Sequence, residues 1–185
     1  MRRALALCAM LLLLPGCALF LPTAPGPGLP QPVAAVDLDR YLGSWFEVAR
    51  LPAPFQDSGG RRCVDVTASY TRRPDGRIAV LNRCLDANDS FRERSAIAVA
   101  SVVEGSGNAR LRVRFFWPFS ADYWVIGLDP DYRWAVVGGP SRRFLWILSR
   151  TPNLPEAELS AARAIAAAQG YPVENLMLTP HGARP

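Results

Sequence analysis

Short segments in which apolar and polar residues alternate fill the middle of this chain. Strict alternation places successive side chains on opposite faces and is typical of a half-buried β-strand. Turn signals such as Pro74-Asp75-Gly76 separate the segments, because proline presets its own φ and glycine accepts a positive φ. The predicted strands are the segment around Trp45 and residues 64–70, 78–84, 91–103, 111–116, 123–128, 134–137 and 144–149. The pattern predicts an all-β fold, an eight-stranded up-and-down antiparallel β-barrel whose interior is wide enough for one small ligand.

One helix is predicted after the strands. Pro155 suits a first helical position, Glu156 and Glu158 lie in the positive first turn, and Gly170 is a stop signal. Apolar residues fall near one stripe of this helix, namely Leu159, Ala162, Ile165 and Ala166. We expect this C-terminal α-helix to pack on the barrel wall.

The first residues predict export. Arg2 and Arg3 precede an apolar run, residues 4–14, that is too short to span a bilayer but has the layout of a secretory signal. The run ends at Leu14-Pro15-Gly16-Cys17, which resembles the site at which a lipoprotein signal peptidase cuts before a lipidated cysteine, although Pro15 departs from the usual small residue. A plain signal peptide with an incidental cysteine is the alternative. Ala18, next to that cysteine, resembles the signal for export to the outer membrane of a Gram-negative cell.

Four regions follow from this reading. Residues 1–16 form the signal peptide, and residues 17–36 form a lipidated Cys17 with a tether rich in proline and glycine. Residues 37–180 form the barrel domain, and residues 181–185 form a tail. The expected location is the periplasmic face of the outer membrane, with attachment through the N-terminal lipid.

Charge adds little to this picture. The 21 basic residues are all arginine and the formal net charge is +5, which falls to +3 when Arg2 and Arg3 leave with the signal. Arg110, Arg112 and Arg114 alternate with apolar residues, which predicts a solvated strand face. No nucleic-acid partner is predicted.

Three motifs resemble those of the lipocalin family. They are the Gly43-Ser44-Trp45-Phe46-Glu47 stretch, the turn at Asp131-Tyr132-Arg133, and Arg150, in the family's order over about residues 37–178. Residues 41–45 and 145–152 are similar to the bacterial outer-membrane lipocalins, the branch akin to apolipoprotein D. The resemblance implies that Trp45 and Arg150 meet at the closed end of the barrel in a cation–π contact. It therefore assigns a structural role to Gly43, Trp45, Asp131, Tyr132 and Arg150.

The cysteines suggest one disulfide. Cys8 lies in the signal and Cys17 is the lipid site, which leaves Cys63 and Cys84 on the two arms of one predicted hairpin. Cys63 lies 11 residues before Pro74 and Cys84 lies 8 residues after Gly76, so a bulge has to absorb the offset. Free thiols or a metal pair are the alternatives, but two ligands without a nearby histidine make a poor zinc site. No metal is predicted.

Little in the sequence supports catalysis. The single histidine, His181, is expected beyond the last packed segment, so a Ser-His or Cys-His mechanism lacks its base. Glu47 is a candidate general base, but in the family a polar residue at this place more often belongs to a hydrogen-bonded floor. The prediction is a protein that is not an enzyme and has no cofactor, with a lipid-modifying isomerase using Glu47 as the rival.

The predicted binding residues line the barrel interior. If Arg110, Arg112 and Arg114 face solvent, the residues between and after them face inward. The alternation gives Leu111, Val113 and Phe115, and the family resemblance adds Tyr70, Ala98, Tyr123 and Val125. Phe55, in the first long loop after Pro52 and Pro54, is expected to cover the mouth. Apolar walls of this kind suit a fatty acid or a lysophospholipid.

The sequence therefore predicts a lipid-anchored lipocalin that binds, stores or transports hydrophobic ligands in the cell envelope. A second rival is a non-catalytic envelope interaction protein whose outer aromatics contact a partner. That patch comprises Trp117, Pro118, Phe119 and Trp124. The sequence leaves the oligomeric state open, with a homodimer among the expected partners.

Overall fold

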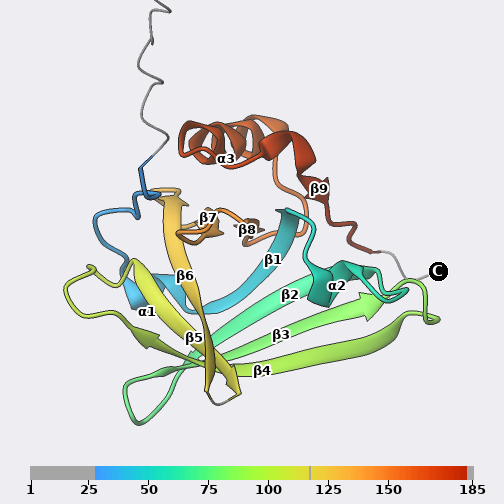
Figure 1. Ribbon diagram of the computed structural model, residues 1–185, viewed down its shortest axis with the longest axis horizontal. Coiled ribbons are helices and arrows are strands. Elements are labelled where there is room, and N and C mark those ends of the chain that lie inside the picture. The colour runs from blue at the N-terminus through green and yellow to red at the C-terminus, as the bar shows by residue number, and fades with distance from the viewer. Residues whose placement is uncertain (1–27, 117, 183–185) are drawn as a thin grey trace, which may run out of the picture.

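The computed structural model describes residues 28–116 and 118–182, and within them eight antiparallel strands close into a barrel (Figure 1). Each strand pairs with the next along the chain, and β8 and β2 both pair with β1, which closes the ring. The predicted fold is thereby confirmed. The strands are β1 (Gly43–Arg50), β2 (Cys63–Arg72), β3 (Ile78–Asp86), β4 (Arg92–Val102), β5 (Arg110–Phe116), β6 (Phe119–Leu128), β7 (Trp134–Gly138) and β8 (Trp146–Ser149).

The two ends of the barrel differ. At the closed end, the short helix α1 (Leu38–Tyr41) precedes β1, whose first residues pair with β2 from Gly43↔Tyr70 to Phe46↔Thr67. At the other end, which we call the mouth, β1 has left β2, and the short helix α2 (Pro54–Asp57) follows β1 (Figure 1). The barrel is thus tightly paired at one end and loosely covered at the other.

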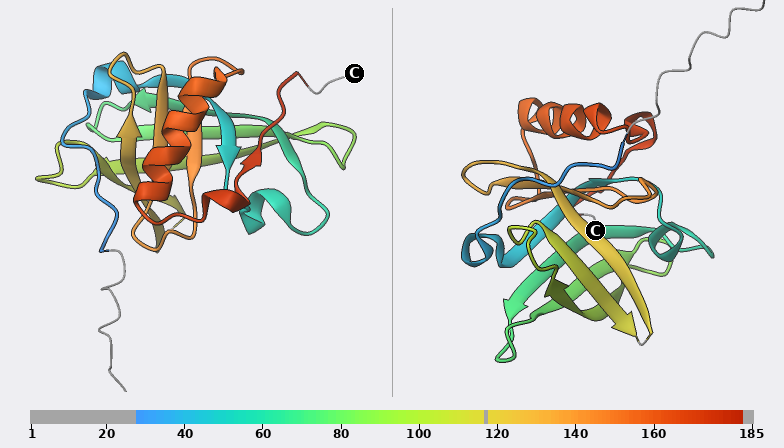
Figure 2. Two further views of the ribbon diagram at one scale, coloured as in Figure 1. Left: turned by 90° about the horizontal axis from the view of Figure 1, so that it is seen from above. Right: turned by 60° about the vertical axis from the view of Figure 1, so that its left-hand side comes forward.

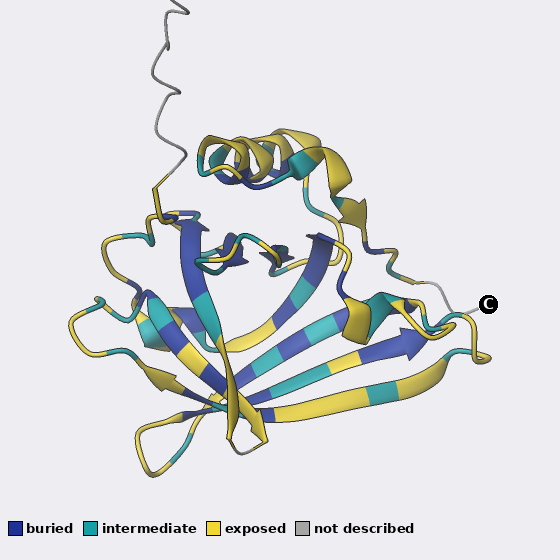
Figure 3. Cartoon of the chain, in the orientation of Figure 1, coloured by how far each residue is buried: buried dark blue, intermediate teal, exposed yellow. Residues whose placement is uncertain are grey.

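Alternation produces two cores, one on each face of the β6–β8 wall. The strands β7 and β8 of this wall, below α3, are buried almost throughout (Figure 3). One core fills the closed half of the barrel, and the other lies between the barrel wall and α3 (Glu156–Ala168). The helix crosses the outside of β6 and β7, as predicted (Figure 2). Gly127 permits this approach, because a Cβ there would lie 3.0 Å from the Ile165 side chain. No helix among the described residues is long and apolar enough to cross a membrane.

The packed unit begins earlier than the sequence analysis placed it. Residues 28–36, expected to be tether, lie against the barrel, where the Val33 amide donates to the Val125 carbonyl (2.9 Å) and the Val36 amide to the Gly107 carbonyl (2.8 Å). Val36 is buried in the barrel core. The proline-rich composition of residues 28–36 predicts an extended chain, and this segment is extended. Its backbone, however, forms hydrogen bonds with the barrel. Residues 1–27, which hold the predicted signal, Cys17 and the rest of the tether, lie outside the described residues.

The C-terminal boundary also differs. The 3₁₀ helix η1 (Val173–Asn175) leads into β9 (Met177–Leu178), which pairs with β1 where β2 has separated from it. His181, expected in a loose tail, is buried: its Nε2 lies 2.8 Å from the Glu47 carbonyl oxygen, and its ring packs on Phe46. The chain end therefore fills the gap that opens between β1 and β2.

Candidate functional site

Trp45 and Arg150 meet at the closed end of the barrel. The Arg150 guanidinium lies 3.7 Å from the centroid of the Trp45 ring and donates to the carbonyls of Arg40, Tyr41, Leu42 and Ser44. The Trp45 indole, which is fully buried, donates to the Tyr41 carbonyl at 2.8 Å. These carbonyls lie at the end of α1 and beyond it, where a helix leaves acceptors unpaired. The predicted cation–π contact is present, and the arginine also caps α1.

The turn between β6 and β7 completes the closed end. Tyr132, at φ 61°, accepts a hydrogen bond from the Asp37 amide (2.8 Å) and lies under the Arg40 guanidinium. Asp131 was predicted as a motif residue of this turn, yet its backbone amide is held by the carboxylate of Asp129, which also accepts from Arg133. Burial opposes ionisation, but these donors outweigh it and lower the pKa of Asp129. The sequence did not single out Asp129, because a second acidic residue, Asp131, lies two positions along the same turn.

Three tyrosine side chains form the floor of the barrel interior, and we call them the tyrosine cluster (Tyr41, Tyr70 and Tyr123). The Tyr123 hydroxyl lies 2.7 Å from that of Tyr41 and 3.0 Å from that of Tyr70. Burial raises the pKa of Tyr70 to about 12 and raises the pKa values of Tyr41 and Tyr123 well above 10. All three therefore stay neutral at physiological pH. Tyr70 and Tyr123 were predicted as binding residues, whereas Tyr41 was not.

The predicted wall residues lie on the inner face of the barrel. Leu111 is paired with Tyr123 and Ala98 with Val80, and cross-strand partners share a face. Val113 and Val125 belong to the same buried cluster as these residues. Apolar side chains thus surround the tyrosine cluster on several strands.

Exposure of the inward side chains increases toward the mouth. Along β4 it rises from Ala100 (1 %) and Ala98 (3 %) to the exposed Ala96. Along β5, Val113 is 6 % exposed and Phe115, two residues nearer the mouth, is 44 % exposed. The interior is therefore closed by side chains at its floor and reached by solvent from the mouth.

An aromatic group lies beside the mouth. Phe55, on α2, is exposed and contacts Phe144 and Trp146, with ring centroids 5.5 and 6.4 Å apart. Phe55 was predicted to cover the mouth. Its two aromatic partners come from a part of the chain about ninety residues away, which is why the sequence did not indicate them.

Glu47 is buried in a hydrogen-bonded network. Its Oε1 accepts from Arg50 Nη1 (2.7 Å) and from the Thr179 hydroxyl (2.6 Å), and its Oε2 accepts from Gln56 Nε2 (2.8 Å). Arg50 also pairs with Asp57 of α2. Both carboxylate oxygens are thus occupied by groups that hold α2 and the C-terminal segment in place, an arrangement that suits a structural role.

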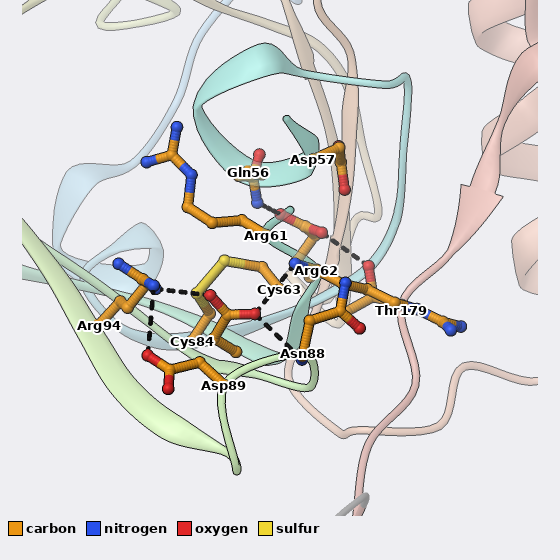
Figure 4. Close-up of a disulfide and its surroundings, with 12 residues drawn as sticks. Gln56, Asp57, Arg61, Arg62, Cys63, Cys84, Asn88, Asp89, Arg94 and Thr179 are labelled. Carbon is orange, nitrogen blue, oxygen red and sulfur yellow. Dashed lines mark hydrogen bonds and ion pairs between the residues drawn. A yellow bond between two sulfur atoms is a disulfide. The ribbon is translucent and has the colours of Figure 1, made fainter. Parts of the chain in front are cut away.

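Cys63 and Cys84 form the predicted disulfide, with the predicted bulge beside it (Figure 4). The β2–β3 register shifts by one residue between Val64↔Leu85 and Thr67↔Arg83, so the bulge takes up only one residue of the offset between the arms. Cys63 is paired with Asp86, and its bond to Cys84 therefore runs diagonally between the strands. Next to the bond, buried Asp86 accepts from Arg94 Nε at 2.8 Å. The disulfide thus joins β2 and β3 near the mouth.

The predicted outer aromatic patch is only partly present. Trp124 is buried under α3, with the Arg110 guanidinium 5.7 Å from its ring, so its assignment to an exposed patch was wrong. Alternation places Trp124 on the outer face, but it could not show that a helix covers that face. Phe116 and Phe119 are exposed and contact each other at 5.3 Å between ring centroids, and Pro118 is exposed. Trp117 lies outside the described residues.

Metal and anion chemistry has little support in the part of the chain that the structure describes. No group of three or more His, Cys, Asp or Glu side chains there could hold a metal ion. Of the β5 arginines, Arg110 stacks on Trp124 and Arg112 lies 3.4 Å from Asp122. Arg112 is thus paired with a carboxylate, whereas Arg110 contacts an aromatic ring that leaves its charge in place.

Comparisons with known proteins agree with this geometry. Residues 36–181 match the family model of the lipocalin-like domain. The chain is 38 % identical over 161 residues to temperature-induced lipocalin-1 of Arabidopsis thaliana, covering 83 % of each chain. It is 38 % identical over 141 residues to the outer membrane lipoprotein Blc of Escherichia coli K12, covering 76 % of this chain and 77 % of that protein. Among solved structures, insecticyanin from the tobacco hornworm Manduca sexta shares the fold at a TM-score of 0.64 and 16 % identity, covering 85 % of this chain and 88 % of that one.

Proposed function

The chain belongs to the lipocalin family, and we propose that it is a lipid-anchored member that binds, stores or transports hydrophobic molecules in the cell envelope. The observation that carries this proposal is the gradient of exposure inside the barrel. Side chains at the floor exclude solvent, whereas Ala96 and Phe115, nearer the mouth, are accessible. An apolar molecule entering there would remove both its own surface and the lining from water, which is favourable.

The proposed ligands are fatty acids and lysophospholipids. The walls at Ala98, Leu111, Val113 and Val125 are apolar, which suits an acyl chain. Glu47, the buried carboxylate of β1, is already bonded on both oxygens. A long hydrocarbon chain with its polar head toward the mouth therefore fits this lining.

The proposed location is the periplasmic face of the outer membrane, reached through lipidation of Cys17. Residues 33 and 36 already bond to the barrel, and residues 18–27, between Cys17 and the described part of the chain, lie outside the described residues. Relatives named outer membrane lipoprotein Blc support this location. Each buried methylene of an acyl chain contributes about 0.8 kcal/mol, so several chains would make attachment effectively permanent. Radiolabelled palmitate should be incorporated into the wild-type protein but not into Cys17→Ala. If the wild-type protein is not labelled either, the proposed anchor is contradicted.

Ligand binding can be measured on residues 18–185, which omit the lipid site but keep every described element. We expect a fluorescent fatty acid to bind saturably at one molecule per chain, and a lysophospholipid to displace it. Ala96→Trp, which fills the interior from the exposed inward position on β4 nearer the mouth, should abolish this binding while the far-ultraviolet circular dichroism stays unchanged. No saturable binding by the wild-type protein, with no displacement by lysophospholipid, would refute the proposal.

We propose that Glu47 has no catalytic role, because Arg50, Thr179 and Gln56 occupy its oxygens. Loss of turnover on a lipid substrate in a folded Glu47→Gln variant would instead support the isomerase-type rival.

The exposed rings of Phe116 and Phe119 favour a second proposal, that two copies of this chain associate through the tip of the β5–β6 hairpin. Sedimentation velocity should then show a dimer for the wild-type protein and a monomer for Phe116→Ser/Phe119→Ser. A monomeric wild-type protein at every concentration would contradict this assignment.

A further inference from the structure

The tyrosine cluster brings three hydroxyl groups from distant parts of the chain into one chain of hydrogen bonds. Tyr41 comes from α1, Tyr70 from β2 and Tyr123 from β6. Tyr123 is central, at 2.7 Å from the Tyr41 oxygen and 3.0 Å from the Tyr70 oxygen. Within the described residues, these two contacts are the only hydrogen bonds that the three hydroxyls make.

Counting protons shows that one donor is left over. Each neutral tyrosine hydroxyl carries one proton, so the cluster holds three. Two oxygen–oxygen contacts use two protons, whichever hydroxyl donates in each contact. One proton is therefore without an acceptor in every arrangement of the cluster. Because burial keeps all three hydroxyls neutral, this surplus is present throughout the physiological pH range.

The surplus proton lies on Tyr123, the tyrosine nearest the barrel interior, when Tyr123 accepts from both of its neighbours. Tyr41 and Tyr70 are buried, whereas Tyr123 keeps partial exposure although its partner across the strands, Leu111, is buried and faces inward. The apolar residues around it, including Val113 and Val125, offer no acceptor from their side chains. In the ligand-free protein, water reaching the cluster would accept this proton.

A ligand that fills the interior has to replace that acceptor. A hydrocarbon end would leave a buried donor unpaired, which lowers affinity by roughly 5- to 150-fold relative to a ligand that supplies an acceptor. A carboxylate is a poorer match, because burying a charge needs more than one donor. The nearby cation, Arg150, already donates to four backbone carbonyls.

We propose that the tyrosine cluster is a donor site for one neutral oxygen acceptor, a carbonyl or hydroxyl oxygen, at the leading end of an elongated hydrophobic ligand. The inference rests on the proposed binding function and narrows its ligand class. It ranks hydrophobes with an oxygen at the buried end above those whose buried end is a plain hydrocarbon, among them a fatty acid or lysophospholipid bound with its head toward the mouth.

The test compares two molecules with the same carbon chain, 2-dodecanone and dodecane, as displacers of the fluorescent fatty acid from residues 18–185. Their affinity ratio is measured in the wild-type protein and in Tyr41→Phe/Tyr70→Phe/Tyr123→Phe, which removes all three hydroxyls without changing shape. Replacing every partner of a hydrogen bond by an apolar group of the same shape is tolerated better than removing one. We expect the triple variant to lose roughly 5- to 150-fold of the preference for the ketone.

A matched control is Tyr171→Phe, which removes a tyrosine hydroxyl bonded to Gly139 outside the barrel. It should leave the ratio unchanged. An unchanged ratio in a folded triple variant would overturn the inference, and so would an equal loss in Tyr171→Phe.

A second measurement keeps the inference testable if the triple variant does not fold. The infrared carbonyl stretch of ¹³C-labelled 2-dodecanone bound to the wild-type protein should lie below its value in hexane, because a hydrogen bond weakens the C=O bond. A stretch equal to that in hexane would overturn the inference while leaving the binding function intact. Failure of the ketone, dodecane and the fluorescent fatty acid all to bind would contradict the proposed function, and this inference with it.

Discussion

Replacing Arg150 by alanine should destabilise the whole barrel. The substitution removes a guanidinium that lies 3.7 Å from the Trp45 ring centroid and donates to four carbonyls at the end of α1 and the start of β1. It leaves the fully buried Trp45 without a cover on that side. Because these contacts join residues 40–45 to the end of β8, their loss acts on barrel closure rather than on one strand.

The size of the loss in unfolding free energy depends on which of the carbonyls bonded to Arg150 can bond to water instead. The carbonyls of Arg40 and Ser44 belong to exposed residues and can be rehydrated, so their loss costs little. The Tyr41 carbonyl belongs to a buried residue, and a charge-assisted bond to it is worth about 1.5–3 kcal/mol. The cation–π contact adds about 0.5–2 kcal/mol. We therefore expect Arg150→Ala to lower the free energy of unfolding by about 2–5 kcal/mol, and Arg150→Lys, which keeps the charge but loses the planar fork, by about half as much.

Urea denaturation followed by tryptophan fluorescence measures this change. Arg143→Ala is the control, since that guanidinium lies 5.3 Å from the Phe144 ring centroid but on the surface, and it should cost less than about 1 kcal/mol. A loss in Arg150→Ala no larger than that in Arg143→Ala would refute the reasoning. Unchanged fatty-acid affinity in the folded fraction would agree with a structural rather than a binding role for Arg150.

Four further predictions concern other parts of the molecule. Cys63→Ser/Cys84→Ser should lower the free energy of unfolding by about 3 kcal/mol on the chain-entropy model, and a loss below 1 kcal/mol in urea denaturation would contradict it. Hydrogen bonds from backbone amides, chiefly that of Arg62, outweigh burial and lower the pKa of Asp86 below 3.8, so its stabilisation is present above about pH 4 and lost as the pH falls through the lowered value. The melting temperature should thus fall more steeply below pH 4 in the wild-type protein than in Asp86→Asn, and equal slopes would count against this. Gly107→Ala combines a φ of 57° with a clash against the Ala34 carbonyl, so amide exchange at Val36 should quicken by about tenfold or more, whereas unchanged exchange would show that the N-terminal segment tolerates it. Phe115→Arg should weaken binding of the fluorescent fatty acid by about tenfold with little change in the urea midpoint, because Phe115 is 44 % exposed at the mouth, and equal affinity would place the ligand elsewhere.

The barrel was predictable because its signals are local. Alternation defines each strand, and glycine and proline mark the turns between them, so eight strands could be counted without any knowledge of contacts. The Trp45–Arg150 pair followed from family motifs. The disulfide followed from export and from the two cysteines left on one hairpin, and the bulge beside it followed from the unequal lengths of the two arms.

The errors have a common physical origin in long-range contacts. Trp124 alternates like any outward residue, and only the position of α3 decides whether its face is wet or buried. His181 and residues 28–36 lie in stretches rich in glycine or proline, yet hydrogen bonds to distant residues attach them to the barrel. Tyr41 joins Tyr123 across 82 residues, a distance at which no periodic pattern in the sequence operates.

Binding inside the barrel is tested most directly by the mass of the intact protein with whatever ligand it carries from the cell. Native mass spectrometry of the wild-type chain, purified without added lipid, should show one bound hydrophobic molecule per chain, identified after solvent extraction as a fatty acid or a lysophospholipid. Ala96→Trp, folded but with the mouth half of its interior filled, should show the bare chain. A wild-type protein that always appears as the bare chain and takes up no lipid when it is supplied, or an Ala96→Trp variant that carries as much ligand, would contradict binding inside the barrel.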